Sequence, residues 1–356
     1  MTMHAVLGET ESTDRPSARG FHEGPAIAAR HWRRPLAEDS PSAPRRLGSP
    51  MEALDALQKA QAAMRASQAL AARVASERFE EIEVRLEPEI ETYWCGMRPT
   101  GRPSYTPALL RGLQDMQRSL VRLFEETPTE AGPPFRYFVV RSLQEGVFNL
   151  GGDLSLFSRH IREGDRDSLA RYATACIDVV YANYVDYGLP IVTIGLVQGD
   201  ALGGGFEAAL SCDVLVAERG AKFGFPEVLF NLFPGMGAYS FLTRRLTGLA
   251  AQEMIASGRI YDAEELAGMG LVDILAEPGE GEEAVRAYIA RNRRRHNAHA
   301  AMFAARRRAQ PTPYEELAAI VDLWVDAAMQ LEPGDLRKME RLVSAQDKRR
   351  LQLAAE

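Results

Sequence analysis

Three consecutive glycines, Gly203, Gly204 and Gly205, lie between an apolar run and a stretch that can form a helix. Glycine admits backbone conformations that other residues avoid, and it lets a ligand approach the chain closely. The amides at the start of the following helix would point outward, with the positive end of the helix dipole behind them. Such amides can hold an oxyanion that develops on a substrate. A tight turn between strand and helix would explain an isolated triplet equally well.

Two glutamates and a second glycine loop add to this signal. Glu207 lies in the first turn of the predicted helix, and Glu227 follows twenty residues later, after another predicted strand. The loop Gly151-Gly152-Asp153 follows an earlier predicted strand. Two carboxylates and the amides of two loops can surround one carbonyl, which the amides polarise while the acids move protons at its α and β carbons. Taken singly, each glutamate would be an ordinary surface or helix-start carboxylate.

The elements that would position these residues alternate between strand and helix from about residue 80 to residue 275. Apolar alternation and short buried runs predict strands at residues 81–87, 91–96, 136–141, 190–197 and 214–217. Helices are predicted over residues 106–126 and 167–187. This alternation indicates the α/β fold class.

The chain divides into four parts. Residues 1–48 are rich in proline, arginine, serine and glycine without a hydrophobic period, which is typical of a disordered tail. Residues 49–79 open with a capping box and predict a helix with a thin apolar face, which packs on a partner subunit or leads into the core. Residues 80–282 form the α/β core, and residues 283–356, without a convincing strand, form a helical C-terminal module.

Composition excludes several classes of protein. A hydrophobic content of 46% with 26% charged residues is that of a soluble globular chain, and no apolar run reaches the length of a membrane span. The first residues lack the apolar stretch of a secretory signal, so we expect a cytoplasmic protein. Three cysteines without a C-x-x-C motif disfavour disulfides and zinc, and no metal site is expected. A net charge of −7 disfavours nucleic acid, and no phosphate-binding glycine motif is present.

The glycine loops carry a resemblance to a known family. The runs FNLGGD (148–153) and QGDALGGGFE (198–207), followed by Pro226-Glu227, resemble the crotonase, or enoyl-CoA hydratase/isomerase, superfamily. Longer runs are similar to the diffusible-signal-factor synthases, bacterial quorum-sensing enzymes that make cis-2-unsaturated fatty acids: FNLGGDLSLF, QGDALGGGFEAALS, PEVLFNLFPGMGAYSFL and WVDAAMQL. The resemblance runs from about residue 80 to the C-terminus. It implies a spiral of ββα turns with a C-terminal helical module that builds trimers.

The resemblance also implies roles for individual residues. The amides of Gly152 and Gly204 would form an oxyanion hole, and Glu207 and Glu227 would be the acid/base pair, with the role of each left open. Retention of both acids favours adding or removing water. The substrate would be a 3-hydroxyacyl thioester on acyl carrier protein, dehydrated and then hydrolysed to a free cis-2-enoic acid, with no cofactor beyond the thioester carrier.

An acyl chain needs an apolar pocket. Met236 and Trp324 are candidate walls because both lie in synthase-like runs, and Leu202 and Phe206 flank the glycine triplet. Ordinary core packing is the alternative for each of them. The arginine-rich stretch 291–308 would usually be a solvated helix face, and the functional alternative is a docking patch for acidic acyl carrier protein or for a cofactor phosphate.

Two other functions remain open. A conventional enoyl-CoA hydratase of fatty-acid degradation would share both loops and both acids. A protein of the same fold that acts mainly by binding a regulatory sensor partner would need neither acid. The partners expected are therefore acyl carrier protein, further copies of this chain in a trimer or hexamer, and a sensor protein, without nucleic acid or membrane.

Overall fold

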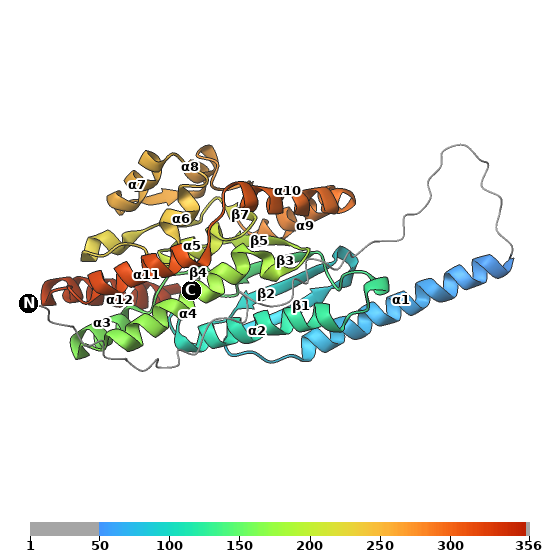
Figure 1. The fold of residues 1–356 in the computed structure, drawn as a ribbon, viewed down its shortest axis with the longest axis horizontal. Helices are drawn as coiled ribbons and strands as arrows, with labels where there is room; N and C mark the ends of the chain where they lie inside the picture. The colour runs from blue at the N-terminus through green and yellow to red at the C-terminus, as the bar shows by residue number, and fades with distance from the viewer. Residues whose placement is uncertain (1–49, 354–356) are drawn as a thin grey trace, which may run out of the picture.

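Most of the chain is arranged around two sheets, drawn in Figure 1. The computed structural model describes residues 50–353, so the expected tail at 1–48 and the cap at Ser49 lie outside the described residues. In the described part, a six-stranded sheet has the order β1-β2-β3-β5-β7-β10 and a four-stranded sheet the order β4-β6-β8-β9. All neighbouring strands are parallel except the pairs β1/β2 and β8/β9.

The large sheet is formed by β1 (Ile82–Glu87), β2 (Thr92–Met97), β3 (Tyr137–Ser142), β5 (Val192–Val197), β7 (Val214–Glu218) and β10 (Ile274–Ala276). The small sheet is formed by β4 (Val147–Asn149), β6 (Asp200–Leu202), β8 (Lys222–Gly224) and β9 (Ile260–Asp262). Every residue of β5 is buried, as expected of a parallel strand covered on both faces. The five predicted strands agree with β1, β2, β3, β5 and β7 within two residues. The three-residue strands of the small sheet were not predicted.

The chain passes three times from the large sheet to the small one, through β3 and β4, then β5 and β6, then β7 and β8. Helices follow each passage: α3 (Leu154–Glu163) and α4 (Arg166–Tyr184) after the first, α5 (Gly204–Leu210) after the second, and α6 (Ala238–Leu242), α7 (Gly248–Ser257) and α8 (Ala263–Gly268) around the third. The short 3-10 helix η5 (Pro226–Phe230) comes directly after β8. The α/β class and the repeated ββα turn are therefore confirmed.

Local sequence explains why the longest core helix forms where it does. In α2 (Pro107–Glu126) the Thr106 hydroxyl accepts a hydrogen bond from the Leu109 amide at 3.0 Å, and Pro107 occupies the first helical position. Its apolar face is buried along the whole length, with Leu109, Leu113, Met116, Leu120 and Leu123 in the core. This helix therefore packs firmly onto the sheet.

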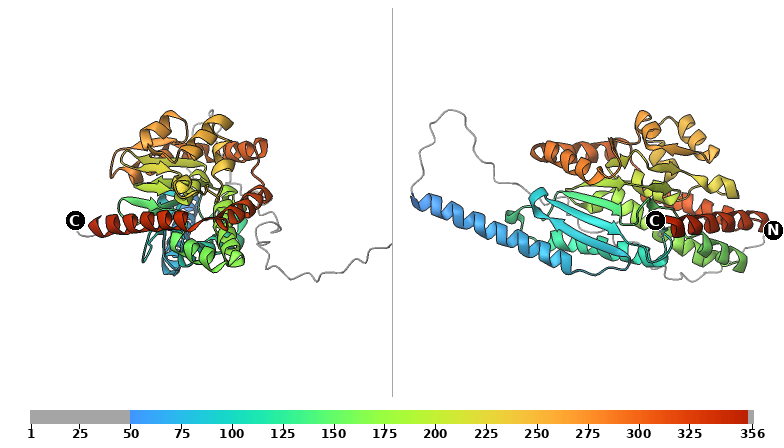
Figure 2. Two further views of the ribbon diagram at one scale, coloured as in Figure 1. Left: turned by 90° about the vertical axis from the view of Figure 1, so that its left-hand side faces the viewer. Right: turned by 180° about the vertical axis from the view of Figure 1, so that it is seen from behind.

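Residues after the last strand form helices, as predicted. They are α9 (Gly281–Asn292), α10 (His296–Ala309), α11 (Tyr314–Ala328) and α12 (Pro333–Leu353). Helix α11 packs against α4, and α12 packs against α3 and η5. Figure 2 shows α12 crossing the end of the molecule opposite to the overhanging part of α1.

Helix α1 (Pro50–Ser76) is attached to the body only by its last turns. Val74 is fully buried and Leu70 is half-buried, whereas Met51, Leu54, Leu57 and Met64 are exposed. The predicted thin apolar face thus exists, and it leads into the core only at its C-terminal end.

Candidate active site

One cavity brings both glycine loops and both glutamates together. Its volume is about 290 Å³, and most of its surface is apolar. Loops after β4 and β6 form one wall, η5 forms another, and α11 and α12 close the far side. Its lining includes Leu150, Gly152, Leu154, Phe157, Tyr172, Cys176, Leu202, Gly204, Glu207, Glu227, Phe230, Met236, Trp324, Leu342 and Ala345. We call it the glutamate cavity.

The two glycine loops touch each other, and glycine is required where they do. Gly151 has a φ of 87°, and a Cβ there would lie 2.9 Å from the Gly204 nitrogen and 3.0 Å from the Leu202 oxygen. The Asn149 Oδ1 accepts a hydrogen bond from the Gly151 amide at 2.8 Å, which fixes the turn. Only a residue without a side chain fits this contact.

Two backbone amides at this contact have no acceptor. Within residues 50–353, neither the Gly152 nor the Gly204 N–H donates a hydrogen bond. Gly204 is the first residue of α5, and Gly203 precedes it with a φ of 52°, so the Gly204 amide belongs to the unsatisfied first turn of that helix. Two free amides beside one cavity can polarise a carbonyl or hold an oxyanion.

Glu207 is buried and fixed. It is 1% exposed, and its Oε1 accepts hydrogen bonds from the amides of Met236 and Ala238 at 2.7 and 2.8 Å. Burial raises the pKa of this carboxyl to about 7, although the hydrogen bonds from the loop after η5 oppose the rise. The carboxyl can therefore change its protonation near neutral pH.

Glu227 has a different environment. Although the residue is half-buried as a whole, its Oε2 is enclosed and finds no hydrogen-bond partner among the described residues. A Cβ on Gly203 would lie 2.3 Å from the Glu227 Oε1, which places this carboxyl directly on the glycine triplet. Burial first, and repulsion from Glu207 second, raise the pKa of Glu227 to about 8.

Three of the four residues predicted to form the cavity wall do so in the structure. Met236, Trp324 and Leu202 line the glutamate cavity. Phe206 does not line it, because its side chain points to the other side of α5 and packs on Phe223 and Phe225, with ring centroids 5.1 and 5.0 Å away. The prediction that Phe206 contacts substrate is therefore corrected.

Sequence reasoning missed several wall residues. Phe157 and Tyr172 form an aromatic group with Trp324, with centroids 5.0 Å apart for Phe157–Trp324 and 5.4 Å for Phe157–Tyr172. Leu342 and Ala345 of α12 also face the cavity. Phe157 belongs to the synthase-like run at 148–157, which was the one signal available, whereas Tyr172 and the α12 residues carry none.

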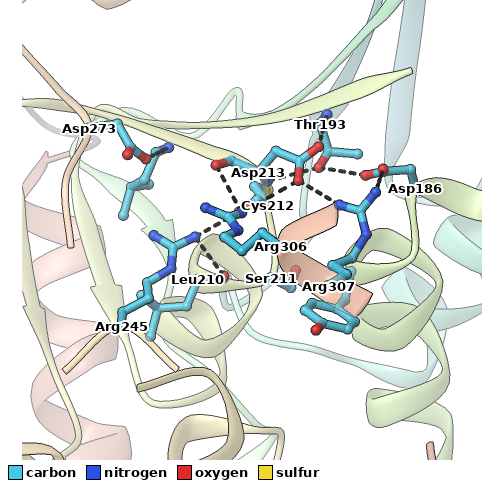
Figure 3. Close-up of polar contacts among 12 residues, drawn as sticks. Asp186, Thr193, Leu210, Ser211, Cys212, Asp213, Arg245, Asp273, Arg306 and Arg307 are labelled. Carbon is cyan, nitrogen blue, oxygen red and sulfur yellow. Dashed lines mark hydrogen bonds and ion pairs between the residues drawn. The ribbon is translucent and has the colours of Figure 1, made fainter. Parts of the chain in front are cut away.

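The arginine-rich stretch 291–308 is partly internal. Figure 3 shows Arg307 between two acids: it donates to Asp213 Oδ1 at 2.6 Å and to Asp186. Its side chain is 16% exposed, so Arg307 itself lies in neither a solvated face nor a docking patch. Arg291, Arg294, Arg295 and Arg308 of the same stretch are exposed, and for them the two alternatives stay predictions. Asp213 immediately precedes β7 and Asp186 lies six residues before β5, so both acids are at the amino ends of these strands, whereas the glutamate cavity lies beyond their carboxyl ends.

The described residues also bear on the expectations for cysteines, metal binding and membrane spans. Cys95, Cys176 and Cys212 are buried free thiols. Residues 50–353 contain no group of three histidine, cysteine or acidic residues placed to hold a metal ion. No helix in that range combines the length and apolarity needed to cross a bilayer.

Comparison with known proteins relates the chain to one described family. A model of the family described as enoyl-CoA hydratase/isomerase matches residues 114–341. The chain is 35% identical over 170 residues to the probable mitochondrial enoyl-CoA hydratase 2 of Arabidopsis thaliana, covering 48% of this chain and 54% of the relative. It therefore spans about half the length of the curated relatives it matches.

Solved structures share the fold. The structure of an enoyl-CoA hydratase from Mycobacterium avium subsp. paratuberculosis matches with a TM-score of 0.59 and 20% identity, covering 75% of this chain and 97% of that one. The human mitochondrial delta3-delta2-enoyl-CoA isomerase matches with a TM-score of 0.60 and 18% identity, covering 76% and 99%. At these identities the likeness establishes the architecture alone.

Proposed function

Because the chain belongs to the enoyl-CoA hydratase/isomerase family, we propose that it removes water from a 3-hydroxyacyl thioester on acyl carrier protein and then hydrolyses the thioester to a free cis-2-enoic acid. The observation that carries this proposal is the pairing of two buried carboxyls with two free amides in one apolar cavity. Synthase-like runs at 148–157 and 226–242 support the carrier and the product.

The amides set the position of the substrate. The thioester carbonyl accepts hydrogen bonds from the N–H groups of Gly152 and Gly204, and the acyl chain extends along the apolar wall that includes Met236 and Trp324. When the α proton leaves, negative charge develops on the carbonyl oxygen, where the two amides stabilise it without reorganising. The α carbon then lies next to the glycine triplet.

The carboxyls take different parts in the dehydration. Glu207 is the base, because two amides donate to its Oε1 and its pKa of about 7 makes it the first of the two to lose its proton. Glu227, with a pKa of about 8 and its carboxyl beside Gly203, keeps its proton and gives it to the departing 3-hydroxyl. One C–H and one C–O bond break, a double bond forms, and water leaves.

Hydrolysis reuses the same groups. A carboxylate of the pair takes a proton from water, which attacks the thioester carbon, and the tetrahedral oxyanion occupies the site of the Gly152 and Gly204 amides. The C–S bond then breaks, and the thiol of the carrier receives the proton. Release of a free acid is what separates this function from simple hydration.

A conventional enoyl-CoA hydratase is the second candidate. The matched relatives that carry this name favour it, and the two carboxyls and two amides serve hydration equally well. The candidates differ in the carrier, in the geometry of the double bond and in the release of free acid.

Mass spectrometry of the products separates the two candidates. The chain is incubated with 3-hydroxydodecanoyl-acyl carrier protein and, separately, with the CoA thioester. We expect free cis-2-dodecenoic acid from the carrier-bound substrate, and a ~10²–10⁴-fold loss of rate in Glu207→Gln and in Glu227→Gln.

A matched control is Glu218→Gln. Glu218 is also a buried carboxylate, but it accepts hydrogen bonds from Gln198 and from the Gly279 and Gly281 amides, outside the cavity. This variant should keep the rate of the parent protein. A trans-2-enoyl thioester without free acid, formed faster from CoA, would move the chain to the conventional hydratases, and no turnover of either carrier would refute both.

A further inference from the structure

The hydroxyl of Tyr172 lies behind the Gly152 loop. Tyr172 belongs to α4, and its ring lines the glutamate cavity. Its hydroxyl accepts a hydrogen bond from the Asp153 amide at 3.0 Å and donates one to the Tyr105 carbonyl. One side chain therefore joins two segments that are nearly fifty residues apart in sequence.

These two segments already meet through the backbone. The Tyr105 amide donates to the Gly151 carbonyl, and the Leu150 amide donates to the Pro103 carbonyl, both at 2.8 Å. The Gly151 carbonyl and the Gly152 N–H belong to the same planar peptide unit and point in opposite directions. Fixing the carbonyl on Tyr105 thus aims the Gly152 N–H away from Tyr105.

We propose that Tyr172 is a positioning residue, whose hydroxyl locks the 151–152 peptide plane so that the Gly152 N–H faces the cavity. The inference rests on the proposed use of that amide as an oxyanion donor. The hydroxyl binds the peptide units on both sides of the contact, at Tyr105 on one segment and at Asp153 on the other. Without it, the Asp153 side of the contact keeps only the backbone bridge between Tyr105 and Gly152, and the 151–152 plane can tilt.

The ring and the hydroxyl of Tyr172 have separable tasks. The Tyr172 ring packs edge-on against the Phe157 ring. The Phe157 ring in turn fills the space beside Gly152, where an added Cβ would lie only 2.3 Å from the Phe157 Cζ. The Tyr172 ring thereby maintains the shape of the cavity, and the Tyr172 hydroxyl maintains the orientation of the Gly152 N–H. Tyr172→Phe removes only the second task.

Hydrogen exchange tests the lock directly. Amide exchange in the full chain is followed by mass spectrometry in the parent protein, in Tyr172→Phe and in Tyr187→Phe. Tyr187 is the matched control, because it is also a buried tyrosine whose hydroxyl makes a hydrogen bond, to Asn183 Oδ1 at 3.0 Å, and it does not line the cavity. We expect exchange over residues 150–156 to become about tenfold faster in Tyr172→Phe alone.

Steady-state kinetics tests the consequence. A tilted amide weakens the stabilisation of charge that develops in the transition state, so kcat should fall about 10- to 100-fold in Tyr172→Phe, while KM stays within about threefold. Tyr187→Phe should keep both values. A purely structural role would lower the stability of both variants and leave kcat unchanged.

Two results would overturn the proposal: unchanged exchange over residues 150–156 in Tyr172→Phe, or faster exchange there with an unchanged kcat. If the parent protein turns over neither carrier, the proposed function fails, and the exchange data still decide whether the hydroxyl holds the loop.

Discussion

Glu207 and Glu227 have the same chemical group in two different surroundings. Two loop amides hold one oxygen of Glu207, whereas the Oε2 of Glu227 is enclosed without a donor from the described chain. Burial raises both pKa values, and the donors keep that of Glu207 the lower, at about 7 against about 8. Between about pH 7 and pH 8, the two carboxyls therefore carry one proton in total.

This sharing predicts a bell-shaped pH profile. Below about pH 7 both carboxyls are protonated and no base remains, while above about pH 8 both are ionised and no acid remains. We expect kcat/KM to be highest near pH 7.5 and to fall tenfold per pH unit far on either side. Initial rates between pH 5.5 and 9.5 measure it, and a profile that rises to a plateau up to pH 9.5 would contradict it.

The same burial has an effect on stability. The folded state holds the Glu227 proton up to about pH 8, whereas the unfolded chain releases it near pH 4.5, so the folded state binds more protons between these values. The free energy of unfolding therefore falls as the pH rises through this window. Glu227→Gln removes the ionisation, and we expect its Tm to exceed that of the parent protein by several °C at pH 9 and by much less at pH 5.

Thermal unfolding of both proteins at the two pH values checks this expectation. Glu218→Gln serves as the control. The Glu218 carboxylate accepts three hydrogen bonds, which the side-chain amide of the new glutamine would disturb. It should lose stability at pH 9. An equal Tm difference for Glu227→Gln at pH 5 and pH 9 would show that ionisation is not the cause.

At the scale of single residues, the sequence identifies the glycines and acids that the site requires. It does not show which apolar side chains face the cavity. The two glycine loops and both glutamates were predicted from their order along the chain, and the resemblance singled out Gly152 and Gly204. The structure brings Gly152, Gly204, Glu207 and Glu227 to one cavity. Phe206 was misplaced because adjacent positions on a short helix point in different directions, and packing alone decides which one meets the cavity.

At the scale of elements, α11 and α12 complete a cavity that the core only begins. Trp324 of α11 lies so close to the loop after η5 that a Cβ on Gly235 would come within 2.6 Å of the indole ring. That loop provides the amide of Met236 to Glu207. The C-terminal helices therefore shape the apolar wall and also support the carboxylate.

Trp324→Ala tests this double role. Removing the indole enlarges the cavity, so kcat/KM should shift toward longer acyl thioesters, and the free energy of unfolding should fall by about 3–5 kcal/mol. The control is Leu323→Ala, because the Leu323 side chain is 64% exposed on the same helix. Rates over a series of chain lengths and urea denaturation measure both effects, and an unchanged chain-length preference would refute the assignment of the wall.

The long elements were predictable and the short ones were not. Strands such as β3 and β5 are six residues long and mostly apolar, and α2 has a complete cap and a continuous apolar face. Strands β4, β6 and β8 are three residues long, too short to show an alternation of apolar and polar residues. They form because each follows a strand of the large sheet, which places it beside its partners in the small sheet. Their pairing is a tertiary effect.

At the scale of the whole molecule, one charged cluster joins the C-terminal helices to the sheet. Arg307 of α10 links Asp186 and Asp213, which precede β5 and β7, and Thr193 hydrogen-bonds to both acids (Figure 3). Burial raises the pKa of both acids, and the guanidinium opposes that rise. The arginine thus compensates two carboxylates that could not otherwise be buried together.

Arg307→Ala should therefore be strongly destabilising. It leaves buried Asp186 without its counter-ion and Asp213 with only Arg306, 3.5 Å away, and we expect the free energy of unfolding to drop by about 3–5 kcal/mol at pH 7. Urea denaturation measures the change, with Arg308→Ala, an exposed neighbour on α10, as a control within about 0.5 kcal/mol of the parent protein. A loss below about 1 kcal/mol would show that the cluster is not an anchor. The sequence could not predict it, because Arg307 lies 121 residues from Asp186.

The three glycines of the triplet are required for different physical reasons. An added methyl would meet the Glu227 carboxyl at Gly203, the thioether of Met236 at Gly204, and the Asn149 carbonyl oxygen at Gly205. The first two obstacles are side chains of the cavity, and the third is the backbone of the fold itself. In a lineage released from selection for catalysis, Gly204 would drift while Gly205 persisted, and the φ of 52° would keep glycine at position 203. A descendant that has lost Gly204 and kept the other two glycines has given up its chemistry and retained its shape.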